Sequence, residues 1–156
     1  MQKEKMSASL VSAERVLSGA EHMLMRILPI SGDEKILLKS LEKTYESAVL
    51  TIGFILKYEY LKRRVVLSKD KNENEKLFFS KCLPKYGLTE KDGKNLKELL
   101  IYGRKQRGSP VTFSRKGYVV IMDDDLGTLE LDEGMLRSYI SSTRELLTSV
   151  SLVCLS

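Results

Sequence analysis

The feature that most constrains the fold is a long amphipathic stretch that begins near Ser31 and ends near Arg64. Apolar or small residues recur along it at steps of three and four, which is the period of an α-helix. They are Leu38, Leu41, Tyr45, Ala48, Ile52 and Ile55. A helix of this length extends roughly 45 Å, so we expect it to be the spine of the domain. Ser31 and Glu34 have the spacing of a capping box at its start.

Further helices are predicted on both sides of this spine. A first helix covers Ser7–Leu28, and we expect Pro29 to stop it because proline disfavours helix in the residue before it. A short helix ends at Pro84, a longer one begins at the N-cap Thr89, and the last begins at Asp132. The apolar stripes of the last two helices are Leu96, Leu99, Leu100 and Gly103, then Leu136, Tyr139, Ile140, Thr143, Leu146, Leu147, Val150 and Val153.

Two short extended segments predict a β-hairpin over about residues 118–131. Tyr118–Met122 is rich in β-branched residues, Asp123–Gly127 supplies turn residues, and Thr128–Leu131 is again extended. An isolated hairpin is marginally stable in water, so we expect it to pack on the helices or to pair with another chain. The predicted fold is mainly α: a four- to five-helix up-and-down bundle, with this hairpin inserted before the C-terminal helix, in a single domain over residues 1–156.

The composition excludes several classes of protein. Two cysteines and one histidine can form neither a disulfide framework nor a usual zinc site, and we expect no metal and no cofactor. No apolar run reaches the roughly 18 to 20 residues of a membrane span, and we expect no signal peptide at the N-terminus. The sequence also lacks the phosphate-binding P-loop and the GxSxG elbow of hydrolases. We therefore expect a soluble, cytoplasmic protein.

The most basic part of the chain is Gly103–Tyr118, called the basic turn below, which holds five cations and no acid. The cations are Arg104, Lys105, Arg107, Arg115 and Lys116. Arginine forks onto phosphate oxygens and lysine adds point charge. We therefore predict that the basic turn binds nucleic acid or phosphate, with Arg63 and Arg64 as outer contacts. In the alternative interpretation these cations belong to a solvated helix end, or they pair with the acidic turn Asp123–Asp125.

A second candidate site lies on the first helix. His22 is the single histidine of the chain, and Arg15 lies about two helical turns before it, hence on the same face. A histidine can transfer protons near neutral pH, so this pair is the alternative, catalytic site. Asp123–Asp125 lack the spacing of an EF-hand loop, and we expect no metal there.

The segment Arg104–Tyr118, together with SPVTFSRKGYVVI, resembles a segment of small archaeal helical proteins that are similar to the HEPN superfamily. The resemblance implies a four-helix up-and-down bundle, frequent dimerisation and a role near RNA or nucleotides. Arg15 and His22 have the Arg–His spacing of HEPN-type ribonucleases, which carry that pair on a late helix. In this chain the pair is on the first helix and the late helices have no histidine, so the resemblance implies a binding member without catalysis.

The function that these features favour is non-catalytic binding of RNA or another phosphate-rich ligand through the basic turn, by a homodimer. One alternative is a HEPN-like endoribonuclease that uses His22 and Arg15. A second alternative is a protein-interaction or toxin–antitoxin-type partner, in which the apolar C-terminal helix and the acidic turn form the contact surface.

Overall fold

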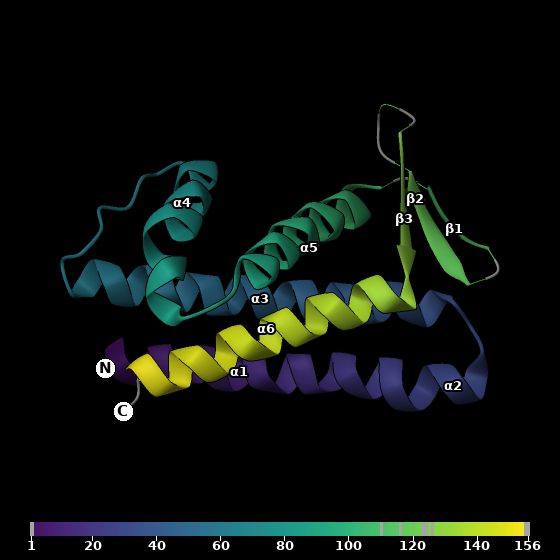
Figure 1. The fold of residues 1–156 in the computed structure, drawn as a ribbon, viewed down its shortest axis with the longest axis horizontal. Coiled ribbons are helices and arrows are strands. Elements are labelled where there is room, and N and C mark those ends of the chain that lie inside the picture. The colour runs from purple at the N-terminus through teal and green to yellow at the C-terminus, as the bar shows by residue number, and fades with distance from the viewer. Residues whose placement is uncertain (1, 110, 116, 123–124, 126, 155–156) are drawn as a thin grey trace.

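The computed structural model describes residues 2–109, 111–115, 117–122, 125 and 127–154. Its long helices run alternately in opposite directions: α1 (Gln2–His22), α3 (Lys35–Leu61), α5 (Glu90–Gly108) and α6 (Glu133–Cys154) (Figure 1). Helices α1 and α5 each pack against both α3 and α6, which closes a four-helix bundle. A small antiparallel sheet precedes α6, so the predicted mainly α fold with an inserted hairpin is confirmed.

The spine helix α3 packs most closely on α1, because small residues face each other there. Ser40 Oγ donates to the Ala20 carbonyl at 3.0 Å, and Ser47 Oγ donates to the Ala13 carbonyl at 2.8 Å. Each serine hydroxyl finds an acceptor in the neighbouring backbone, so these polar groups are buried without an unpaired donor. The predicted apolar stripe of α3 is buried at Leu41, Ala48, Ile52 and Ile55, whereas Leu38 and Tyr45 are half-buried.

The start of α3 differs from the predicted capping box. Ser31 Oγ accepts the Asp33 N–H at 3.3 Å, and Asp33 Oδ1 accepts the Lys35 N–H at 3.0 Å. The side chain of Glu34 does not reach back to Ser31. Instead its carboxylate accepts the backbone N–H of Gly117 at 3.5 Å, so it links the start of α3 to the sheet.

The prediction that Pro29 stops the first helix is wrong. The chain continues through a π-turn, η1 (Met23–Ile27), into the short helix α2 (Leu28–Ser31). The Leu28 N–H bonds to the Met23 carbonyl, five residues back. This wider turn accommodates a residue that has no N–H and whose ring would clash with a regular helical turn. The helix ends only at Gly32, whose φ of 65° is left-handed.

The same arrangement occurs a second time in the chain. Helix α4 (Lys71–Leu77) continues through a second π-turn, η2 (Phe78–Cys82), into the 3₁₀ segment η3 (Leu83–Tyr86). Pro84 is again the second residue after the π-turn, and Gly87, with a φ of 71°, again ends the segment. In both places a π-turn adds one residue to the helical turn before a Leu-Pro pair, and the next long helix of the bundle follows shortly after.

The predicted caps of the last two long helices are confirmed. Thr89 Oγ1 accepts the Asp92 N–H at 3.1 Å, and Asp132 Oδ1 accepts the Met135 N–H at 2.8 Å. All residues of the two predicted stripes are buried except Val153, which is 44% exposed. Among the described residues, no helix combines the length and apolar character that crossing a bilayer requires.

The sheet has the strand order β1 (Val111–Arg115), β2 (Tyr118–Met122) and β3 (Thr128–Asp132). The predicted hairpin corresponds to β2 and β3, and β1 adds a third strand along the edge of β2. Val119, which pairs with Leu131, has its side chain in the bundle core, as has Leu131 itself. The hairpin therefore packs on the helices, as expected.

A buried carboxylate ties the ends of three elements together. Glu59 of α3 has a side chain only 1% exposed, and its Oε2 lies 3.2 Å from Arg64 Nη1 and 3.9 Å from Lys85 Nζ. The Tyr86 hydroxyl donates to Glu59 Oε1 at 3.2 Å and lies 3.6 Å from the Cys154 Sγ atom at the end of α6. Two cations and a hydroxyl thus satisfy a charge that would otherwise be costly to bury.

The end of α6 is only partly covered. Cys154 is half-buried against Tyr86, whereas Leu152 is 69% exposed and Val153 is 44% exposed. Val150 of the same helix is fully buried. The two exposed side chains leave an apolar surface at this end of the bundle.

Candidate phosphate-binding groove

An open groove of about 390 Å³ lies between the outer face of α5 and the segment formed by α4 and η2. Its lining combines three cations, one carboxylate, an aromatic ring, an aliphatic side chain and a hydroxyl. These residues are Lys76, Lys97, Arg104, Glu75, Phe79, Ile101 and Ser80. We call it the α4–α5 groove. Helices α4 and α5 lie on the side of the bundle opposite α1 (Figure 1).

One wall of this groove is a face of α5, and the opposite wall includes the second π-turn, η2. Lys97, Ile101 and Arg104 are spaced by four and three residues, so they lie one above another on α5. Phe79 and Ser80 belong to η2 and line the opposite wall. A π-turn is rare and occurs frequently at functional sites.

Arg104 and Glu75 form a two-pronged ion pair across the groove. Arg104 Nη1 donates to Glu75 Oε2 at 2.5 Å, and Nη2 donates to Oε1 at 3.2 Å. The hydrogen bonds with Glu75 raise the pKa of the Arg104 guanidinium above its ordinary value. Both side chains remain in contact with water, with exposed fractions of 45% and 28%. An exposed ion pair of this kind contributes little to stability, so Arg104 can exchange its partner.

Lys97 and Ile101 give the groove a mixed cationic and apolar surface. Lys97 Nζ lies 5.3 Å from the centroid of the Phe79 ring, a cation–π contact. Ile101 is 45% exposed although it is aliphatic. Surfaces that bind single-stranded nucleic acid combine cations for the backbone with rings on which bases stack.

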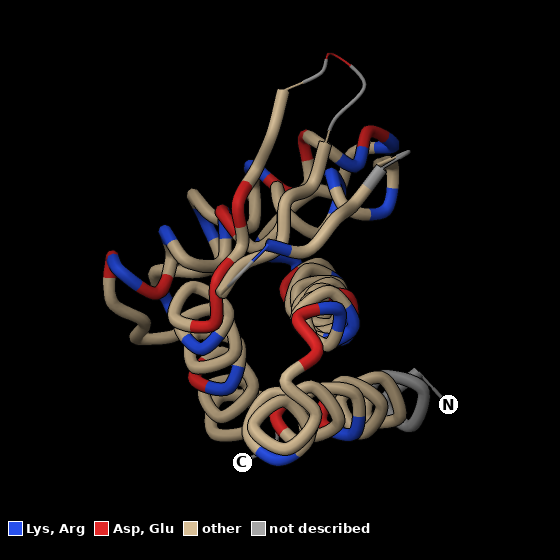
Figure 2. The backbone as a smooth tube through the Cα atoms, turned by 90° about the vertical axis from the view of Figure 1, so that its right-hand side faces the viewer, with Lys and Arg blue, Asp and Glu red and all other residues tan. Residues whose placement is uncertain are grey.

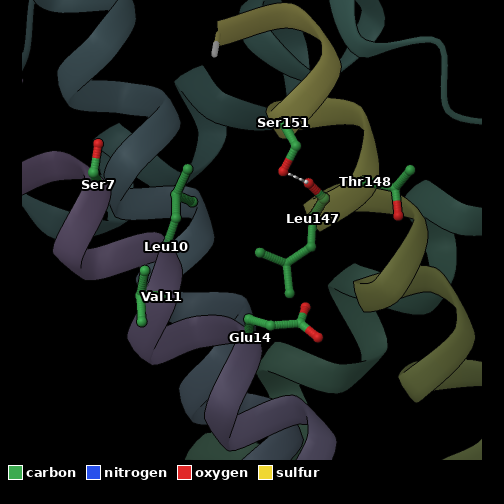
Figure 3. Close-up of a pocket in the computed structure, with 7 residues that line it drawn as sticks. All are labelled: Ser7, Leu10, Val11, Glu14, Leu147, Thr148 and Ser151. Atoms are coloured by element: carbon green, nitrogen blue, oxygen red, sulfur yellow. Dashed lines mark hydrogen bonds between the residues drawn. The ribbon is translucent and has the colours of Figure 1, made fainter. Parts of the chain in front are cut away.

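A second groove, of about 440 Å³, lies between the start of α1 and the end of α6. We call it the α1–α6 groove. Its lining residues are Ser7, Leu10, Val11, Glu14, Leu147, Thr148 and Ser151. Figure 3 shows the aliphatic side chains of Leu10 and Leu147 between the two helices, with the Glu14 carboxylate at one end. Val11 is 57% exposed, so the groove has an apolar rim as well as an apolar floor.

The described cations of the basic turn have different neighbours in the structure. Arg104 lines the α4–α5 groove, and Lys105 is exposed beside it on α5. Arg107 instead contacts α3, where its guanidinium carbon lies 4.8 Å from the centroid of the Tyr45 ring. Figure 2 shows Lys and Arg interspersed with Asp and Glu along the chain. Among the described cations of the basic turn, Arg104 is the one that lines the groove.

Strand β1 carries the far end of the basic turn away from α5. Five extended residues span roughly 13 Å from first to last at about 3.3 Å per residue. Arg115, at the end of this strand, has its guanidinium carbon 5.5 Å from the centroid of the Phe113 ring. The turn that follows contacts the start of α3 through Gly117. Lys116 lies outside the described residues.

Arg63 and Arg64 lie at the far end of α3 and do not extend the groove. Neither side chain is among those that line it. Arg64 binds the buried carboxylate of Glu59. Arg63 has a left-handed φ of 60° at the position where the helix ends. Arg64 thus has a structural role at this end of the bundle.

Arg15 and His22 are both exposed on α1 and line neither groove. The neighbouring carboxylates Glu14 and Glu21 each bind the guanidinium of Arg144, which joins α1 to α6. Among the described residues, no group of three or more His, Cys, Asp or Glu side chains is arranged to hold a metal. Asp123 and Asp124 of the acidic turn, and hence their predicted pairing with the basic turn, lie outside that part of the chain.

Sequence reasoning missed Lys76, Lys97 and Phe79. A signal for Lys97 was present, because Lys97, Ile101 and Arg104 recur at helical steps beside the apolar stripe of α5. Glu75 gave no local signal, since 29 residues separate it from Arg104.

Comparisons of this chain with protein families, with curated proteins and with solved structures found no match.

Proposed function

We propose that the protein is a cytoplasmic module that binds RNA, or a smaller ligand with the same phosphate chemistry, through the α4–α5 groove. The observation that carries the proposal is the convergence of Lys76, Lys97 and Arg104 on one open groove beside the exposed side chain of Ile101. The cations suit phosphate oxygens, and the apolar wall suits an unpaired base. A net charge of +5 favours the approach of an anionic ligand.

The position of the single histidine supports binding without catalysis. His22 and Arg15 are on α1, whereas the groove lies across the bundle between α4 and α5. A general acid or base must reach the reacting atom within hydrogen-bond distance. A ligand seated in the α4–α5 groove is beyond the reach of His22.

The test is fluorescence anisotropy with a short labelled single-stranded RNA at several salt concentrations. We expect the affinity to fall steeply with salt as counterions are released. Lys97→Ala should lower the affinity and reduce the salt slope by about 1. The matched control is Lys57→Ala, which removes an exposed lysine from α3 outside the groove. Absence of binding at low salt, or binding that salt does not weaken, would overturn the proposal.

The His22→Ala substitution distinguishes an endoribonuclease from a module that only binds RNA. If the module only binds, wild-type protein leaves a labelled RNA intact, and His22→Ala binds with unchanged affinity. Cleavage by the wild type that His22→Ala and Arg15→Ala both abolish would establish the alternative instead.

A second candidate role, association with another protein chain, is favoured by the α1–α6 groove. We propose that its occupant is a second copy of this chain, so that the protein is a homodimer. The exposed side chains of Val11, Leu152 and Val153 supply apolar contact surface at this end of the bundle. Arg144 is already bound by Glu14 and Glu21, so its charge is compensated when a second apolar surface covers it. A different occupant, such as an antitoxin-type partner, is the competing outcome.

A further inference from the structure

The carboxylate of Glu75 occupies the position on Arg104 that a phosphate would take. Both of its oxygens meet the guanidinium, one at 2.5 Å from Nη1 and the other at 3.2 Å from Nη2. Carboxylate and phosphate groups both engage an arginine fork through two parallel N–H···O bonds. The ion pair therefore marks a built anion site, filled by a side chain of the same molecule.

Glu75 can leave this site without disturbing the core. It belongs to α4, a seven-residue helix in which no residue is buried. The carboxylate is 28% exposed, so water can solvate it when it is released. Because exposed ion pairs contribute little to stability, a ligand that brings a full phosphate charge can replace the carboxylate.

The surface next to the anion site suits a nucleobase. Ile101 lies one helical turn before Arg104 and is 45% exposed. Phe79 lines the opposite wall, and Lys97 lies over its ring. Apolar and aromatic side chains beside a cation are the features on which single bases stack. The groove volume of about 390 Å³ lies within the range of small-molecule sites, roughly 300 to 1,000 Å³.

From these contacts we infer that the α4–α5 groove is a subsite for one nucleotide, whose phosphate replaces Glu75 on Arg104 and whose base packs against Ile101 and Phe79. Glu75 is then an internal competitor that lowers the affinity for the nucleotide. The inference rests on the proposed function, and the nucleotide is either free or one unit of an RNA strand.

The test is calorimetric titration of wild type and Glu75→Gln with adenosine monophosphate. Glutamine keeps the shape of the side chain but removes the charge that competes with phosphate. We expect Glu75→Gln to bind about two- to fivefold more tightly than wild type, the range that corresponds to an exposed ion pair. The matched control is Glu145→Gln on α6, which removes an exposed carboxylate that lies outside the groove. It should leave the affinity unchanged.

Equal or weaker nucleotide binding by Glu75→Gln would overturn the inference, provided that thermal unfolding shows the variant to be folded. Adenosine and inorganic phosphate are the ligand controls, and each should bind more weakly than the monophosphate. If inorganic phosphate binds as tightly as the nucleotide, base packing against Ile101 and Phe79 is refuted.

RNA titrations distinguish the sources of the nucleotide and separate this inference from the proposed function. A gain in RNA affinity for Glu75→Gln assigns the subsite to a strand, whereas a gain for the monophosphate alone assigns it to a free nucleotide. RNA binding by the wild type without any effect of Glu75→Gln refutes the inference and leaves the proposed function standing. If neither protein binds RNA or nucleotide, the proposed function itself fails.

Discussion

The ring of Tyr45 on α3 occupies the space that a side chain at Gly103 of α5 would need. A Cβ atom on Gly103 would lie 2.1 Å from Tyr45 Cδ2 and 2.8 Å from Tyr45 Cβ. Real Cβ atoms do not approach other atoms this closely. The absence of a side chain at Gly103 therefore allows α3 and α5 to pack at this short distance. The position of the next residue, Arg104, in the groove depends on that packing.

Gly103→Ala should destabilise the fold by about 1 to 3 kcal/mol, because the added methyl group forces α3 and α5 apart. The helix preference of alanine over glycine, about 1 kcal/mol, acts in the opposite direction and offsets part of this loss. Urea unfolding followed by circular dichroism measures the difference in free energy.

The matched control is Gly53→Ala, in the interior of α3, where a Cβ atom would meet nothing within 4 Å. There the helix preference acts alone and should stabilise the protein by about 0.4 to 1 kcal/mol. If alanine stabilised the protein at both glycines, the ring of Tyr45 would have to move aside without a cost in folding free energy.

Arg63→Gly should stabilise the protein by about 1 kcal/mol. Arg63 has a φ of 60° at the end of α3, a conformation that costs a residue with a Cβ atom roughly this much and glycine almost nothing. Thermal unfolding measures the gain. Arg63→Ala removes the same charge but keeps the Cβ atom, so an equal gain from alanine would contradict the backbone explanation.

The long helices α3, α5 and α6 were predictable from the sequence because each has a local signal. The period of the apolar residues places α3, α5 and α6, and the spacing of Thr89 and Asp92 places a cap. The continuation of the first helix through Pro29 was not predictable in this way. A π-turn changes which carbonyl accepts each N–H, and that change leaves no mark on the apolar period.

The candidate site was predicted only in part. Arg104 was among the predicted residues, but its neighbours in the sequence are not its neighbours in space, because β1 is extended and carries Arg115 away. Its true partners, Glu75 and Phe79, are on a different element. Their proximity depends on how η2 packs against α5, which is a tertiary contact that no local pattern encodes.

Alkaline pH should destabilise the fold through two tyrosines. Burial raises the pKa of both Tyr86 and Tyr139 above the ordinary value of 10.0, with a further contribution from Cys154 and Glu59 at Tyr86 and from Glu98 at Tyr139. The unfolded chain therefore loses these protons at a lower pH than the folded chain. The stability contribution is complete below about pH 10 and is lost as the pH rises above it.

The measurement is the free energy of unfolding in urea at neutral pH and at about pH 11, with tyrosinate absorbance recorded in parallel. We expect tyrosinate absorbance from the two buried rings to appear together with loss of helical signal. Equal unfolding free energies at the two pH values would show that these phenols ionise in the folded protein.

The homodimer proposal predicts that a charge in the α1–α6 groove dissociates the dimer. Val11→Glu places a carboxylate on the groove wall, where the partner copy would have to bury it. Sedimentation velocity should show a dimer for the wild type and a monomer for the variant. Val66→Glu is the control, because Val66 is 87% exposed and lies outside the groove. A monomeric wild type at high concentration would refute the proposal.

The two cysteine thiols are buried to different extents, so their alkylation reports on two different unfolding events in the unmodified chain. Cys82 is completely buried, whereas Cys154 is half-buried in the last turn of α6. Burial raises the pKa of both thiols, and because the thiolate is the reactive form, alkylation of either must wait for exposure. The rate at Cys154 then measures fraying of one helix end, and the rate at Cys82 measures rarer opening of the whole interior. A single mass-spectrometric time course thus separates partial from global unfolding without any engineered label.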